Sequence, residues 1–277
     1  MRAAHALRPL PPPAGYRDTG GDGPVVVLIH GVGLDKDMWA AQVEALRIDC
    51  RVIAVDMLGH GDSPQPPAGA TLEDYAEHLR GVLDALGVAS AVLIGFSMGA
   101  LLARAFALAW PDRVAALVLL NGVFARSPEV RAAIVARVAE VEAHGPAANL
   151  DAALERWFSP DFRRIHADYI ARLRDRFAAN DPVGYARSYR LFATQDAYGL
   201  DRLGEIAAPT LVATGEHDVG STPAMAQALA SHITGAAVRV IPGARHMMPV
   251  EMPAETNALL RGFLQSVAPQ RRVPGDR

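Results

Sequence analysis

The sequence predicts an α/β protein in which a mostly parallel sheet is covered by helices on both faces and one helical segment is inserted. Short apolar runs rich in β-branched residues alternate with stretches of helical spacing over most of the chain. This alternation stops between about residues 123 and 203, where no β-like run occurs. The chain has 277 residues, 51% of them hydrophobic and 21% charged, which suits one substantial core.

Six apolar runs are predicted to form the strands. Residues 25–29 are five apolar, mostly β-branched residues that follow Gly23-Pro24. Such an unbroken run is typical of a strand that is buried on both faces of a parallel sheet. The remaining runs have the same character and span residues 52–55, 91–94, 114–120, 210–213 and 238–241.

Stretches of helical spacing lie between these runs and are predicted to cover the sheet. They span residues 38–47, 72–86, 98–110, 222–231 and 253–266. Thr71 precedes the second stretch and Asp74 follows three positions later, which is the pattern of a capping box.

The segment that breaks the alternation contains only helix-forming stretches, at residues 129–142, 150–158 and 169–177, separated by Gly145-Pro146, Ser159-Pro160 and Asp181-Pro182. An insertion between two strands is well placed to cover the carboxyl ends of the sheet, where open α/β sheets bind ligands. We therefore expect a core domain of residues 1–122 and 204–277 and a helical cap of residues 123–203.

Composition excludes several classes of protein. With 30 acidic and 27 basic residues, the net charge of −3 argues against a nucleic-acid or acidic-membrane partner. The single cysteine, Cys50, leaves no internal disulfide and no cysteine-based zinc site. No run approaches the 18 apolar residues of a membrane span, and residues 1–16 lack the apolar stretch of a secretory signal. These features predict a cytoplasmic location, with a frayed tail at residues 269–277.

The pentapeptide Gly95-Phe96-Ser97-Met98-Gly99 lies where the third predicted strand turns into a helix. In that context G-x-S-x-G is typical of a nucleophile elbow, a turn too tight for side chains two residues from the serine. Ser97 is therefore the predicted nucleophile. The backbone N–H of Met98, at the start of the helix, is predicted to be one oxyanion donor.

A serine hydroxyl needs a base to remove its proton, and in this arrangement the acid and then the histidine follow the serine along the chain. His246 comes after the last predicted strand and is the predicted base. Asp218 ends the loop that leaves the preceding strand and is the predicted acid. Its task is to orient the imidazole and stabilise the imidazolium.

Other residues compete for these roles. His217 is next to Asp218 but lies on a loop unsuited to reach Ser97, and Glu216 and Glu251 are further candidates for the acid. An acid could also follow the strand at residues 114–120, where the chain carries Asn121.

The second oxyanion donor is predicted on the loop after the strand at residues 25–29. This loop reads His30-Gly31-Val32-Gly33, and its glycines allow the backbone to approach a bound carbonyl. We assign the role to the N–H of Val32. His30 is interpreted as bracing this loop, and His60 as a structural residue of the turn after the second predicted strand. A metal site is not expected, because His60, His217 and His246 do not have the spacing of metal ligands. No metal or organic cofactor is expected.

Several stretches carry a family resemblance besides the serine turn. They are residues 27–31 (Val-Leu-Ile-His-Gly), 56–63 (Asp-Met-Leu-Gly-His-Gly-Asp-Ser), 208–212 (Ala-Pro-Thr-Leu-Val), and His246 with Pro249, Glu251 and Pro253 behind it. Over about residues 16–267 the chain resembles the α/β-hydrolases. Within them it looks most like the 3-oxoadipate enol-lactonase group, on residues 111–121 and 154–158. The resemblance implies the α/β-hydrolase fold, with a first strand shortened by the prolines at 9–13.

The predicted reaction is hydrolysis of a small carboxylic ester or enol-lactone through an acyl-enzyme on Ser97, in a monomer or homodimer. Arg156 could present a guanidinium to a substrate carboxylate while Trp157 forms an apolar wall. Either residue could equally be part of an ordinary cap helix. Trp39, near the oxyanion loop, is expected to be pocket wall or core.

Three other functions are alternatives to the predicted ester or lactone hydrolase. A hydrolase that cleaves C–C bonds of aromatic ring-cleavage products would use the same three side chains. An epoxide or haloalkane hydrolase would need a carboxylate where Ser97 stands. A non-catalytic receptor for a small ligand could keep the same fold and residues.

Overall fold

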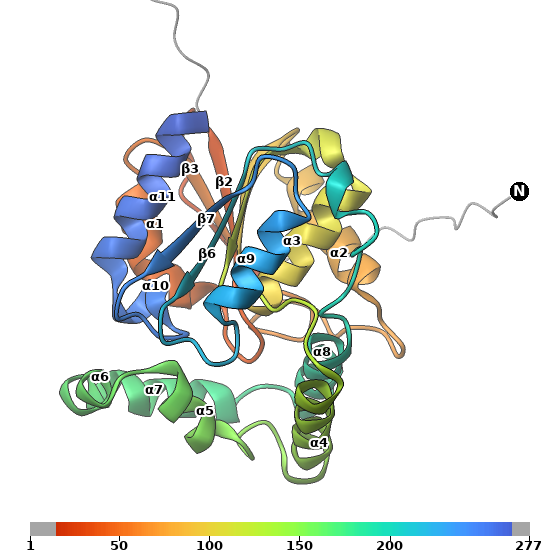
Figure 1. Ribbon diagram of the computed structural model, residues 1–277, viewed down its shortest axis with the longest axis vertical. Coiled ribbons are helices and arrows are strands. Elements are labelled where there is room, and N and C mark those ends of the chain that lie inside the picture. Colours follow the sequence, from red (N-terminus) through yellow and green to blue (C-terminus); the bar gives the residue numbers. More distant parts are fainter. Residues whose placement is uncertain (1–14, 268–277) are drawn as a thin grey trace, which may run out of the picture.

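The seven strands of the protein form one sheet in the computed structural model, which describes residues 15–267 (Figure 1). The sheet order is β1-β3-β2-β4-β5-β6-β7, and every neighbouring pair is parallel except β1 with β3. The strands span Tyr16–Asp18 (β1), Val25–Ile29 (β2), Arg51–Val55 (β3), Ala91–Phe96 (β4), Val114–Leu120 (β5), Thr210–Gly215 (β6) and Ala237–Ile241 (β7). The predicted fold class and all six predicted strands are confirmed.

The family resemblance implies a shortened first strand, but β1 is not among the six strands located from the sequence. This strand has only three residues and pairs antiparallel with β3, with Tyr16 opposite Val55. Three residues at a sheet edge are too few to show an alternating or continuous apolar pattern. The proline run at residues 9–13, the first fourteen residues of the predicted core domain and the predicted frayed tail lie outside the described residues.

Helices cover both faces of the sheet, as predicted: α1 and α11 lie on one face, and α2, α3 and α9 on the other (Figure 1). Their bounds are Ala40–Leu46 (α1), Leu72–Ala85 (α2), Met98–Ala109 (α3), Pro223–Ser231 (α9) and Pro253–Val267 (α11), with a short α10 at Met248–Glu251. A 3₁₀ turn, Lys36–Trp39, precedes α1. The predicted capping box of Thr71 and Asp74 is formed at the start of α2.

Five helices follow β5 and lie beyond the carboxyl ends of the strands (Figure 1). We call them the cap helices: α4 (Pro128–His144), α5 (Leu150–Trp157), α6 (Pro160–Ile165), α7 (Ala167–Ala178) and α8 (Pro182–Thr194). The division of the chain into two domains at residues 123 and 203 stays a prediction.

Two cap helices, α6 and α8, begin at dipeptides that the sequence analysis interpreted only as interruptions. Ser159 Oγ accepts the N–H of Phe162 at 3.1 Å, and Asp181 Oδ1 accepts the N–H of Gly184 at 2.8 Å. In each case the following proline occupies the first helical position, where a backbone N–H would have no partner. The Ser-Pro and Asp-Pro pairs are therefore helix starts.

The glycines around Ser97 are required by the packing of the turn. A Cβ atom on Gly95 would overlap the carbonyl oxygen of Gly99, and a Cβ atom on Gly99 would overlap that of Ile29. We expect Gly99→Ala to lower the free energy of unfolding by about 2–3 kcal/mol, because the backbone of β2 must move. Chemical denaturation measures the change.

Gly262→Ala is the matched control, because Gly262 lies in α11 with no atom within 4 Å of the added methyl group. It should leave stability unchanged or raise it by up to about 1 kcal/mol. Equal losses in the two variants would contradict the packing argument.

In the part of the chain that the structure describes, no helix combines the length and apolar character needed to cross a bilayer.

Candidate active site

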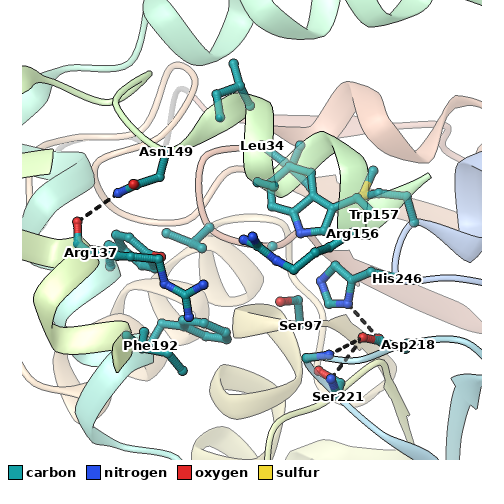
Figure 2. Close-up of a pocket in the computed structure, with 18 of the residues that line it drawn as sticks. Leu34, Ser97, Arg137, Asn149, Arg156, Trp157, Phe192, Asp218, Ser221 and His246 are labelled. Atoms are coloured by element: carbon teal, nitrogen blue, oxygen red, sulfur yellow. Dashed lines mark hydrogen bonds and ion pairs between the residues drawn. The ribbon is translucent and has the colours of Figure 1, made fainter. Parts of the chain in front are cut away.

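A cavity of about 190 Å³ lies between the carboxyl ends of the strands and the cap helices. Ser97, Asp218 and His246 line it from the core, and Trp157 and Arg156 line it from α5 (Figure 2). The structure thus brings together at one pocket three side chains that are far apart in the sequence.

Ser97 occupies the turn between β4 and α3 with φ 54° and ψ −113°. Positive φ is rare for a residue with a side chain, and such strain is concentrated at functional sites. Its N–H donates to the carbonyl oxygen of Leu120 on β5 at 2.9 Å, which fixes the turn against the sheet. Ser97 therefore presents its hydroxyl to the cavity from a rigid and sharply bent backbone.

His246 and Asp218 are hydrogen-bonded to each other at 2.7 Å, from His246 Nδ1 to Asp218 Oδ2. Both side chains are buried, and the imidazole packs beside the rings of Phe96 and Trp157, at centroid distances of 5.0 and 6.0 Å. An ionised carboxylate can only accept, so Nδ1 carries the proton and Nε2 is left free to accept one.

The carboxylate of Asp218 is held by four hydrogen bonds. Oδ1 accepts the N–H groups of Gly220 and Ser221, both at 2.9 Å, and Oδ2 accepts from His246 and from Asn121 Nδ2 at 2.8 Å. Burial alone would raise the pKa of Asp218. The charge and hydrogen bond of His246, with the hydrogen bonds from Asn121 and Ser221, outweigh burial and lower this pKa.

Asn121 was considered in the sequence only as the occupant of a position where an acid could stand. It follows β5 directly, has φ 49°, and is fully buried. Its amide donates to the acid instead of replacing it. The contact of Asn121 with Asp218 depends on the tertiary fold. The sequence indicates only that Asn121 stands at the end of β5, which is the neighbour of β6 in the sheet.

We expect Asn121→Ala to make the protein less resistant to acid. The depressed pKa of Asp218 stabilises the fold fully above the unfolded value near 3.8, and this contribution is lost as the pH falls through the folded value. Without the amide the folded pKa rises toward 3.8, so acid unfolding should begin at higher pH. The loss at neutral pH should be about 1–2 kcal/mol. Tryptophan fluorescence during acid titration reports the midpoint.

Asn257→Ala is the control for this prediction. Its amide bonds to Gln42 and to the carbonyl oxygen of Ala41, without a carboxylate partner. It should therefore lower stability by a similar amount at every pH. An unchanged acid midpoint in Asn121→Ala would contradict the assigned role.

The competing acids serve other purposes. Glu216 is exposed and accepts the N–H of Gly243 at 2.8 Å, and His217 beside it is exposed as well. Glu251 accepts the N–H of Ser159 at 2.9 Å. Nearby, the N–H of Met247 donates to the carbonyl oxygen of Trp157 at 3.1 Å. These two hydrogen bonds connect the segment after His246 to the end of α5.

The predicted oxyanion donors both have free N–H groups. Met98 is the first residue of α3, where the N–H has no intrahelical acceptor. The N–H of Val32 bonds to no residue within 15–267, and Val32 lines the cavity together with Ser97. Their assignment as an oxyanion hole stays a prediction.

His30 and His60 hold the loop that carries Val32. His30 Nε2 accepts the N–H of Met57 at 3.0 Å, and His60 Nε2 accepts the N–H of Gly33 at 2.9 Å. Burial lowers the pKa of both rings, that of His60 to about 3, so both stay neutral and can accept these bonds. Their structural interpretation agrees with these contacts.

The structure places only two of the three predicted substrate-binding residues at the cavity. Trp157 and Arg156 line it, whereas Trp39 does not. Trp39 is fully buried in the core, where its ring stands edge-on to Phe96 at a centroid distance of 6.3 Å. Of the two environments expected for Trp39, pocket wall or core, these contacts agree with the core, and Phe96 is the ring of this pair that lines the pocket.

No group of three or more His, Cys, Asp or Glu side chains is placed to hold a metal ion among residues 15–267.

Comparison with known proteins gives a consistent family. The family model described as alpha/beta hydrolase fold matches residues 24–253. An (E)-2-((N-methylformamido)methylene)succinate hydrolase of Acinetobacter baylyi is 31% identical, over 89% of this chain and 92% of its own. A 3-oxoadipate enol-lactonase of the same organism is 30% identical, over 88% and 90%. The crystal structure of an enol-lactonase from Burkholderia xenovorans LB400 superposes with a TM-score of 0.84 at 34% identity, covering 90% of this chain and 95% of that one.

Proposed function

The chain belongs to the α/β-hydrolase family, and we propose that it is a serine hydrolase that cleaves a small carboxylic ester or enol-lactone through an acyl-enzyme on Ser97. The observation that carries the proposal is the 2.7 Å hydrogen bond of His246 with Asp218 beside Ser97 in one pocket. The similarity to two enol-lactonases, at 30% and 34% identity, supports the lactone.

The proposed reaction begins when Nε2 of His246 takes the proton of Ser97 Oγ as the oxygen attacks the carbonyl carbon. The N–H groups of Met98 and Val32 stabilise the oxyanion, and Asp218 stabilises the imidazolium. His246 then protonates the leaving oxygen. Water, deprotonated by His246, attacks the acyl-enzyme and releases the acid. In a lactone the leaving oxygen stays attached to the acyl chain.

Within residues 15–267 no hydrogen bond joins Ser97 Oγ to His246, whose Nδ1 bonds to Asp218. Catalytic contacts of this kind commonly tighten only in the substrate complex.

Three measurements test the proposal. A fluorophosphonate should label Ser97, as peptide mass spectrometry would show, and p-nitrophenyl esters should be turned over. A panel of enol-lactones, simple esters and vinylogous diketones then compares kcat/KM. Preference for the diketones over every ester and lactone would favour C–C bond cleavage. Absence of both labelling and turnover, for every compound in the panel, would favour a receptor.

The cytoplasmic location and the choice between monomer and homodimer stay predictions from the sequence.

A further inference from the structure

Three arginines line the part of the cavity formed by the cap. They are Arg126, on the segment between β5 and α4, Arg137 of α4 and Arg156 of α5. Figure 2 shows Arg137 and Arg156 entering the pocket from different sides, with Arg156 and Trp157 above Ser97. The sequence analysis named only Arg156.

The two labelled arginines have no acidic partner. Within residues 15–267 no side chain forms an ion pair or hydrogen bond with the guanidinium of Arg137 or Arg156. The Nε atom of Arg137 is buried without a partner. A buried donor that lacks an acceptor destabilises the fold unless a ligand satisfies it.

Arg126 is buried, and the hydrogen-bond donors of its guanidinium are only partly satisfied. Its guanidinium donates to the carbonyl oxygen of Phe192 at 2.8 Å and lies over the ring of that residue, while its Nε has no partner. The nearby carboxylate of Asp196 accepts the backbone N–H of Arg126 and forms an ion pair with Arg131 at 3.1 Å. Arg137 and Arg156 therefore contribute two positive charges to the pocket, and in the part of the chain that the structure describes neither forms an ion pair with a carboxylate.

Neighbouring positive charges act on Arg156 and on Tyr189, which also line this part of the cavity. Burial, and then the charge of Arg137, lower the pKa of Arg156. Burial lowers the pKa of Arg126 to about 10. Burial raises the pKa of Tyr189, while Arg137, Arg156 and Arg126 all oppose that rise, so the phenol lies near each of them. Arg126 is buried and Arg137 and Arg156 are half-buried, and partly desolvated guanidinium groups form strong, charge-assisted hydrogen bonds with anions.

We propose that Arg137 and Arg156, with Arg126 behind them, bind two carboxylates of a substrate that carries its scissile ester or lactone bond at Ser97. The position of the scissile bond rests on the proposed function, whereas the anion site rests on the arginines alone. Two uncompensated guanidinium groups on different helices match two separate carboxylates better than one compact anion.

Calorimetric titration of the full chain with an isosteric series tests the site. Succinate carries two charges, succinamate one and succinamide none, at nearly constant shape. We expect each added charge to tighten binding about tenfold or more, because a charge-assisted hydrogen bond is gained each time. Sulfate, a compact dianion, should bind more weakly than succinate. Equal affinity for succinate and succinamate, or tighter binding of sulfate, would overturn the two-carboxylate assignment.

Substitution of single arginines tests which residues bind succinate. Arg137→Gln and Arg156→Gln should each reduce the ratio between succinate and succinamate affinity to less than about threefold, and Arg137→Lys should restore part of it. Arg172→Gln removes an exposed arginine of α7 and is the control. An equal loss in Arg172→Gln, or unchanged ratios in both pocket variants, would reject the site.

The same samples separate this inference from the proposed function. Turnover of the neutral ester p-nitrophenyl acetate reports Ser97, and the succinate series reports the arginines. Binding that tightens with each added charge, with neither fluorophosphonate labelling of Ser97 nor turnover of any compound in the panel, would support the anion site and reject the hydrolase. Turnover of p-nitrophenyl acetate without any dependence of binding on ligand charge would support the hydrolase and reject the anion site.

Discussion

Ser97→Ala should lose at least about 10⁴-fold in kcat for p-nitrophenyl esters while the fold is unchanged. The alanine removes the atom that forms the acyl-enzyme, and neither His246 nor the oxyanion donors can replace it. The fold should persist because the backbone N–H to Leu120, which fixes the turn, does not involve the side chain. Stopped-flow kinetics measures the loss, and circular dichroism checks the fold.

Ser221→Ala provides the control, because Ser221 also lines the cavity and contributes to the site through its backbone N–H, not its hydroxyl. It should keep activity within about tenfold of the wild type. Retention of more than a hundredth of the activity by Ser97→Ala would show that another residue is the nucleophile.

Asp218→Asn should also lose about 10⁴-fold in kcat. The reason lies in the hydrogen bonds that the Asp218 carboxylate accepts. Each carboxylate oxygen of Asp218 accepts two N–H donors. An amide has one oxygen, so its NH₂ group must face either Gly220 and Ser221 or Asn121 and His246. In the second case His246 can keep its hydrogen bond only by exposing an unprotonated Nδ1, and Nε2 then carries the proton and cannot act as the base.

A neighbouring carboxylate gives the comparison for this variant. Glu216 lies two residues before Asp218, and within the described part of the chain its exposed carboxylate accepts a hydrogen bond only from the N–H of Gly243. Glu216→Gln is therefore the control. Its activity should fall less than about threefold. If both substitutions caused the same loss, general disturbance of the loop after β6, and not the tautomer of His246, would explain it.

Regular features of the fold could be predicted because their signals are local. The runs at residues 25–29 and 114–120 coincide with β2 and β5, since buried parallel strands need continuous apolar residues. The elbow at Ser97 was visible because its glycines stand at fixed offsets. By contrast, β1 was too short to show a pattern, and α8 begins at an Asp-Pro pair that was taken only as an interruption.

Parts of the site could not be predicted because they depend on side chains that meet only in the folded chain. Asn121 reaches Asp218 from a different strand, and nothing in the residues next to it indicates that contact. Arg126 and Arg137 are not distinguished from the many other arginines of the chain until the segment before α4, and α4 itself, bring them to one cavity. The sequence leaves pocket wall and core both open for Trp39, because proximity to the oxyanion loop in sequence does not show on which side of Phe96 the indole packs.

The two hydrogen bonds between α5 and the segment after His246 have a thermodynamic consequence. Any outward displacement of α5 breaks the bond of Met247 to Trp157 and that of Ser159 to Glu251, at about 0.5–1.5 kcal/mol each. The same displacement removes the indole that packs beside the imidazole. Displacement of α5 and the position of the His246 imidazole are thus linked equilibria, so a ligand that holds α5 in place also stabilises the packing around His246.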